Sequence, residues 1–108
     1  TTMLDAQLLV LDLIRALRPL CEQIARQSAD LADQLRRAAT SVMLNLGEGV
    51  RRTGRDKARA YRIAAAEAQE VRAAIEAAVA WGWVDDAAVA PARALADRVG
   101  RVTYALAR

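Results

Sequence analysis

Apolar residues recur at spacings of three and four along four segments of this 108-residue chain, and no other feature limits its fold as strongly. Such spacings place apolar side chains along one face of an α-helix. The predicted inward stripes are Val10, Ile14, Leu17, Cys21 and Ile24; Leu31, Leu35, Ala38, Val42 and Leu46; Ala60, Ala64, Ala68, Val71, Ile75 and Ala78; and Val89, Leu95, Val99, Val102 and Leu106.

These stripes predict an all-α fold, because the chain has no alternating strand pattern. Short polar connections between amphipathic helices favour an antiparallel up-down-up-down four-helix bundle, formed by one domain over residues 1–108. Alanine-rich helices bury little area each, so a chain of this size gains modest stability alone. The composition therefore favours assembly into a homo-oligomer.

Capping and stop residues predict where each helix begins and ends. The predicted helices are 4–27, 31–46, 54–80 and a last one with Pro91 in its first turn. Pro19 is expected to kink or split the first helix near Arg18, and residues 85–90 are expected to form a separate turn. The remaining boundary signals are Ser28 or Asp30 as an N-cap, Gly47 and Gly49 as the end of the second helix, a Thr53–Asp56 capping box, Gly82 as the end of the third helix, and Asp85 or Asp86 as the next cap.

The scarcity of reactive side chains argues against an enzyme. The chain has no histidine, and Cys21 is its one cysteine, so no internal disulfide, usual transition-metal site or nucleophilic triad is expected. We expect Cys21 in the core, and no catalytic residues, metal ligands or cofactors.

The sequence predicts neither a membrane span nor a signal peptide. It contains no apolar run of about 18 residues, so no membrane span is expected. Its first twenty residues carry Asp5 and Asp12 and have no basic front region, which does not resemble a signal peptide. A cytoplasmic location is therefore expected.

Positive charge is concentrated in the middle of the chain. Between Arg36 and Arg62 there are eight basic and two acidic residues, a balance of +6, while the rest of the chain has a balance of −3. Arginines near a helix N-terminus are suited to phosphate groups, although an ordinary solvated face stays open as an alternative. Tyr61 is the only aromatic residue within this track, so recognition of nucleic-acid shape or backbone is expected over base stacking. The predicted nucleic-acid-binding residues are Arg51, Arg52, Arg55, Lys57, Arg59 and Arg62.

A second polar group, in the helix at 31–46 and just after it, runs against local preference. Arg37, Ser41, Asn45 and Glu48 fall within an arc of roughly 80° on a helical wheel. Asparagine is a weak helix former, and a helix C-terminus disfavours a carboxylate such as Glu48. We expect Asn45 to bond a neighbouring backbone and Glu48 to bond an arginine. A solvated polar face is the alternative.

The stretch QLRRAATSVMLNLGEG, followed by RRT, RIA and Glu70, resembles a bacterial family of four-helix-bundle proteins. These proteins are found in intervening sequences of the large-subunit ribosomal RNA gene, and the accessory variability determinants of diversity-generating retroelements belong to the same group. The resemblance implies a ring-like homopentamer with no known catalytic activity. The family pattern falls on Arg36, Arg37, Ala38, Ser41, Asn45, Leu46, Gly47, Glu48 and Gly49, and later on Ile63, Ala64, Glu70 and Val71. Leu46 and Gly47 depart from it, since the family has Ile and Ala there.

Two hypotheses of different classes follow. In the first, a non-enzymatic oligomer binds RNA or DNA backbone through the arginine track; the resemblance to the retroelement members adds a reverse transcriptase as a partner. In the second, the oligomer is a scaffold for a protein partner and its arginines form ion pairs. In both, a structural or interface network is expected from Arg37, Ser41, Asn45, Glu48, Gly49 and Glu70.

Overall fold

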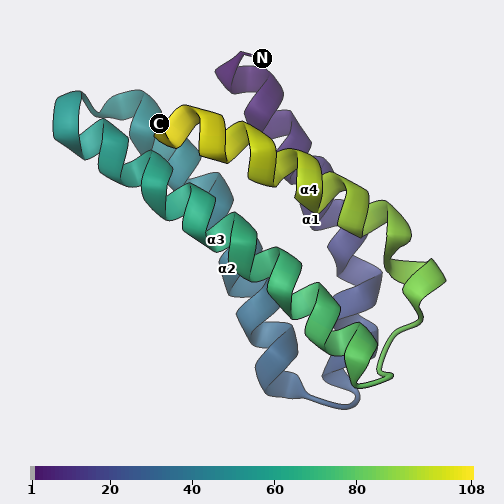
Figure 1. The fold of residues 1–108 in the computed structure, drawn as a ribbon. Helices are drawn as coiled ribbons and strands as arrows, with labels where there is room; N and C mark the ends of the chain where they lie inside the picture. The colour runs from purple at the N-terminus through teal and green to yellow at the C-terminus, as the bar shows by residue number, and fades with distance from the viewer. Residues whose placement is uncertain (1) are drawn as a thin grey trace.

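Four long helices make up the structure, a computed structural model that describes residues 2–108 (Figure 1). No strand occurs within that range, so the predicted all-α class is confirmed. None of the helices found there is long and apolar enough to cross a membrane. The helices are α1 (Met3–Ala25), α2 (Ala29–Arg51), α3 (Gly54–Ala80) and α4 (Asp86–Ala107).

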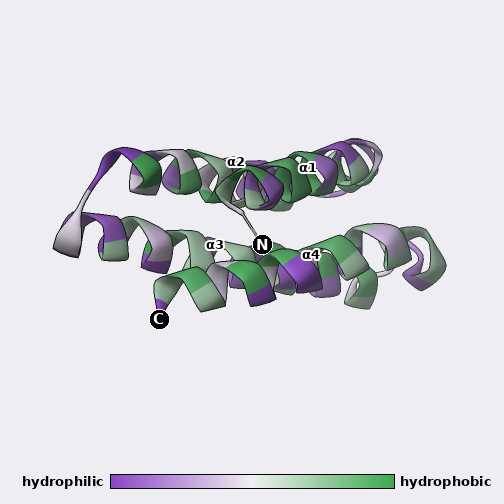
Figure 2. Ribbon diagram, turned by 90° about the horizontal axis from the view of Figure 1, so that it is seen from above, coloured by the Kyte–Doolittle hydropathy of each residue, from purple (hydrophilic) through white to green (hydrophobic). Residues whose placement is uncertain are grey.

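The helices form a compact bundle of two layers. Figure 2 shows α1 and α2 in one layer and α3 and α4 in the other. Each helix packs against its neighbours in the sequence, and α1 also packs against α4. Every helix therefore buries two flanks and leaves one face for solvent or partners.

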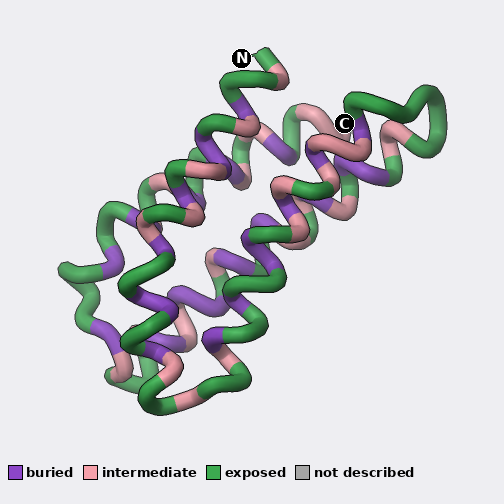
Figure 3. Tube along the Cα trace, turned by 180° about the vertical axis from the view of Figure 1, so that it is seen from behind, coloured by how far each residue is buried: buried purple, intermediate pink, exposed green. Residues whose placement is uncertain are grey.

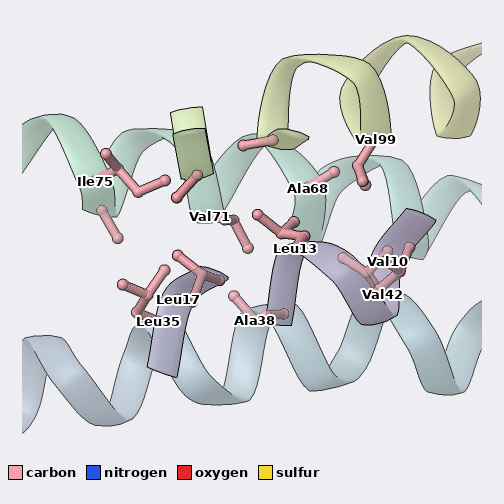
Figure 4. Packing of buried hydrophobic residues seen from close by; sticks show 14 of the residues in the cluster. Val10, Leu13, Leu17, Leu35, Ala38, Val42, Ala68, Val71, Ile75 and Val99 are labelled. Atoms are coloured by element: carbon pink, nitrogen blue, oxygen red, sulfur yellow. The ribbon is translucent and has the colours of Figure 1, made fainter. Parts of the chain in front are cut away.

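A single cluster of mostly aliphatic side chains fills the space between the layers (Figure 4). Leu13 and Val42 are fully buried, and Val71 and Val99 reach the same cluster from α3 and α4. Burial of one such side chain stabilises the fold by roughly 1.5–3 kcal/mol. Figure 3 shows buried positions recurring along each helix, as the spacing predicts. Members of the predicted stripes that are only half-buried are Ile14, Leu31, Leu95, Val102 and Leu106.

The end of α2 and the start of α3 project beyond the other two helices (Figures 1 and 2). Only Arg52 and Thr53 join these helices, so the two remain close together to the end. We call this projection the tip and define it as residues 45–62. It carries most of the positive charge that stands out in the sequence.

The predicted split of the first helix and the predicted turn before Pro91 are both wrong. Helix α1 is continuous from Met3 to Ala25 through Pro19, so of the two expected outcomes, a kink or a split, the split does not occur. Proline removes one backbone donor, but Leu17 and Leu20 are buried on either side of it, and their packing favours a continuous helix. Residues 86–90 likewise belong to α4, which runs through Pro91, so they form no separate turn.

The predicted end of α2 is also wrong. Gly47 and Gly49 lie inside the helix, and neither has the positive φ that a glycine stop uses. The left-handed glycines among the described residues are Gly54 and Gly82.

Capping follows the prediction at one connection and departs from it at another. Ser28 caps α2, as its oxygen accepts a hydrogen bond from the amide of Leu31 at 3.1 Å. Thr53 precedes α3 but makes no side-chain cap bond, so the predicted capping box with Asp56 does not form. The positive φ of Gly54, +57°, departs from the right-handed helical start that a capping box requires.

Candidate nucleic-acid interface

The six predicted cations come together at the tip. Arg51 is the last residue of α2, Arg52 follows it, and the other four occupy the first turns of α3. Lys57 is half-buried, and the five arginines Arg51, Arg52, Arg55, Arg59 and Arg62 are exposed. Against these six stand two carboxylates, Glu48 and Asp56, so the tip has a balance of +4.

Glu48 binds two of the arginines. Its Oε2 accepts a hydrogen bond from Arg51 Nη2 at 2.7 Å. Its Oε1 accepts from Arg52 Nε at 2.8 Å and lies 2.6 Å from Arg52 Nη2. These bonds, with Arg52 the stronger contributor, hold the pKa of Glu48 below its usual value. One carboxylate thus orients two guanidinium groups at the end of α2.

The four cations of α3 are not paired in this way. Within residues 2–108, no carboxylate forms an ion pair with Arg55, Lys57, Arg59 or Arg62. Arg55 and Arg62 lie opposite the buried Val71 stripe on the helical wheel. Their charge is therefore available to an external anion.

Between α2 and α3, a polar hollow of about 280 Å³ lies at the base of the tip. Asn45 and Glu48 line it from α2, and Asp56 and Arg59 line it from α3. Arg52 also lines it. Donors and acceptors therefore both face this hollow, which suits a hydrated contact with polar groups.

The predicted polar network is only partly connected. Asn45 Nδ2 donates to the Ser41 carbonyl at 2.9 Å and to its hydroxyl at 3.1 Å, both within α2. Arg37 and Glu70 line one hollow together with Ser41, but they form no ion pair in the described chain.

Glu67 lines that same hollow and was not singled out from the sequence. Burial, together with neighbouring Glu70, raises the pKa of Glu67. The i,i+3 spacing of these two carboxylates was the available signal.

Gly49, the remaining predicted network residue, is buried against an aromatic ring. A Cβ added to Gly49 would lie 2.8 Å from Cδ1 and from Cζ of Tyr61. Tyr61 itself is 8% exposed, so it packs the base of the tip and is not an external stacking surface. The closest approach of α2 and α3 at this level therefore depends on glycine.

A larger ion-pair network, which was not predicted from the sequence, joins α3 to α4. Arg93 donates to Glu76 at 2.8 and 3.0 Å and to Asp86 at 2.8 Å. Arg72 bonds Glu76 and donates to Asp97 at 2.7 Å. The i,i+4 spacing of Arg72 and Glu76 was visible, but the partners on α4 depend on the register between helices.

The described residues offer little to metal or thiol chemistry. No group of three or more histidine, cysteine, aspartate or glutamate side chains is placed to hold a metal ion within residues 2–108. Cys21 is 2% exposed, as expected of a core residue, and burial raises the pKa of its thiol. Its thiolate is therefore disfavoured at neutral pH.

The chain matches the model of a known protein family. A family model described as 23S rRNA-intervening sequence protein matches residues 4–105, nearly the whole chain. No curated protein and no solved structure shows significant similarity to the chain.

Proposed function

The chain belongs to the 23S rRNA-intervening sequence protein family, and from this we propose that it is a non-enzymatic, single-domain bundle that binds RNA or DNA backbone through its tip. The binding residues in this proposal are Arg51, Arg52, Arg55, Lys57, Arg59 and Arg62. The family's name associates it with ribosomal RNA, which is loosely consistent with a nucleic-acid ligand.

The observation that carries the proposal is the unpaired charge of α3. Arg55, Arg59 and Arg62 are exposed and have no ion-pair partner in the described chain. A polyanion releases condensed counterions when such groups replace them, which drives binding without base contacts. The projection of the tip gives a nucleic-acid strand room to approach it.

The proposal extends to assembly and location. We propose antiparallel neighbouring helices, supported by the two-residue connection between α2 and α3. We also propose a homopentameric ring, as the resemblance implies, and a cytoplasmic location, as the sequence pattern favours. Five tips on one ring would multiply a weak phosphate contact by avidity. A reverse transcriptase as protein partner rests on the resemblance to retroelement accessory proteins alone. Light scattering tests the ring, with an expected mass of five 11.7 kDa chains.

The central test replaces Arg55, Arg59 and Arg62 with glutamine. We expect the slope of log affinity against log salt to fall by up to about 2 for a single strand, because each lost phosphate contact removes about 0.7. Filter binding over a salt series measures that slope, and circular dichroism confirms that the variant remains folded.

A matched control removes the same charge elsewhere. Arg15, Arg18 and Arg26 are exposed on or just after α1, away from the tip. Their triple replacement by glutamine should leave the slope close to that of the parent. Equal slopes for all three proteins would refute the tip as the binding surface.

The second candidate function is a scaffold that binds a protein partner. Exposed apolar side chains favour it, since Leu4, Leu8 and Leu44 are 62%, 49% and 65% exposed. In this reading the tip arginines would pair with carboxylates, as Arg51 and Arg52 do with Glu48. The scaffold would show no measurable affinity for RNA or DNA even at low salt.

A further inference from the structure

Tyr104 of α4 is an exposed aromatic side chain beside a hollow between α3 and α4. It is 62% exposed, and the guanidinium of Arg108 lies 5.8 Å from its ring centroid. The hollow has a volume of about 300 Å³. An apolar ring held this far into solvent, next to a concave surface, is available to stack on a planar ligand.

The side chains around the hollow have the chemistry that a nucleotide requires. Gln69 and Arg101 line it together with Tyr104, and they offer an amide and a guanidinium. Asp97 also lines it, but Arg72 holds that carboxylate at 2.7 Å. Arg101 has no ion-pair partner in the described part of the chain.

The register between α3 and α4 brings this hollow toward the tip. Arg93 pairs with Glu76, Asp97 pairs with Arg72, and Gly100 faces Gln69. Residues nearer the C-terminus of α4 therefore lie opposite residues nearer the first turns of α3. Figures 1 and 2 both show the C-terminal end of α4 beside the first half of α3, the half that carries Arg62.

We propose that this hollow binds one nucleotide of a single strand, with its base stacked on Tyr104, while the adjoining backbone follows the tip arginines. Arg101 pairs with the phosphate of that nucleotide, and the Gln69 amide bonds the base edge. Duplex ends apart, the bases of a duplex are stacked on one another and cannot stack on Tyr104, so the site selects single-stranded nucleic acid. This inference rests on the proposed function, because it extends the same basic surface.

The experiment compares Tyr104→Ala, Tyr104→Leu and Tyr104→Phe on a labelled single-stranded oligouridine and on an RNA duplex of equal length. Loss of one base–aromatic stack should weaken single-strand binding by roughly 5- to 150-fold in the alanine and leucine variants. The phenylalanine variant should bind like the parent, and duplex binding should not change in any variant. The leucine variant preserves apolar bulk, which keeps the test valid if alanine disturbs the fold.

Trp81→Ala is the matched control, since Trp81 is 70% exposed but follows the opposite end of α3. It should bind both probes like the parent. Parental single-strand affinity in Tyr104→Ala and Tyr104→Leu would overturn the inference and leave the tip proposal intact. A parent that binds only the duplex would also overturn it. A parent that binds neither probe, nor a DNA strand or duplex of the same length, would refute the proposed function itself.

Discussion

Gly49 of α2 lies against the ring of Tyr61 of α3, so closely that a Cβ at position 49 would come within 2.8 Å of three ring carbons. Gly47, two residues earlier in the same helix, has no atom within 4 Å of the equivalent position. Both glycines lie in the same helix, but a side chain would be crowded at position 49 and free at position 47. Substitutions at the two positions therefore distinguish the effect of packing from that of backbone freedom.

Gly49→Ala should destabilise the protein, whereas Gly47→Ala should stabilise it by about 0.5–1 kcal/mol through helix propensity. At position 49 the same propensity gain is outweighed by overpacking, which costs about 1–3 kcal/mol. Urea unfolding followed by circular dichroism measures both. The clash account is wrong if Gly49→Ala costs as much in a Tyr61→Ala background as in the parent, because removal of the ring should relieve the alanine.

The same glycines explain why the end of α2 was mispredicted. A glycine pair after an apolar stripe usually marks a helix end, and the sequence alone cannot distinguish a stop from a close contact. The distinction depends on Tyr61, twelve residues away from Gly49 on the next helix. By contrast, the bounds of α3, Gly54 to Ala80, were predicted correctly, because Gly82 and the apolar stripe before it are local signals, although the capping box expected at its start does not form.

In the candidate site, too, local features were predictable from the sequence and contacts between helices were not. Helical spacing placed Arg55, Arg59 and Arg62 on one stripe, and the unfavourable position of Glu48 at a helix C-terminus predicted its bond to an arginine. The sequence could not place Tyr104 beside α3, because that proximity arises from the register between two helices. Hydrophobic periodicity predicts which face of a helix is buried, but it does not predict which residues of two helices lie in contact.

The ion-pair network between α3 and α4 should contribute modestly to stability. Glu76→Gln removes the shared acceptor of Arg72 and Arg93, and we expect the free energy of unfolding to fall by about 1 kcal/mol, since the pairs are partly exposed. Asp12→Asn is the control, because its pair with Arg15 is 61–66% exposed and should contribute almost nothing. Thermal melts at low and high salt measure both; a cost that does not shrink with salt would contradict an electrostatic origin.

The pKa of Glu48 should lie below the ordinary glutamate value of 4.5, and the pKa of Glu67 should lie above it. The pKa of Glu48 is lowered by Arg52 and Arg51, so its contribution to stability is present above pH 4.5 and is lost as the pH falls through its folded pKa. The pKa of Glu67 is raised by burial and by Glu70, so stability should decrease as the pH rises from 4.5 through its folded pKa. Carboxyl-detected NMR titration measures each midpoint.

Two variants test the causes of these pKa shifts. Arg52→Gln should raise the midpoint of Glu48, and Glu70→Gln should lower that of Glu67. Neither variant should move the other carboxylate, because the two perturbed groups have separate neighbours. A common midpoint for Glu48 and Glu67 in the parent protein would contradict both environments.

Glu48→Gln should tighten nucleic-acid binding, because it releases Arg51 and Arg52 from their shared carboxylate. If both guanidinium groups then contact phosphates, the salt dependence of binding should steepen by about 1–2 in log–log slope. Asp56→Asn removes the same charge from the same tip, but Asp56 forms no ion pair within residues 2–108. It should therefore raise affinity without steepening the slope. If the slope of log affinity against log salt is identical in the two variants, Glu48 lowers affinity only through its negative charge. Arg51 and Arg52 then make no additional phosphate contacts when Glu48 is removed.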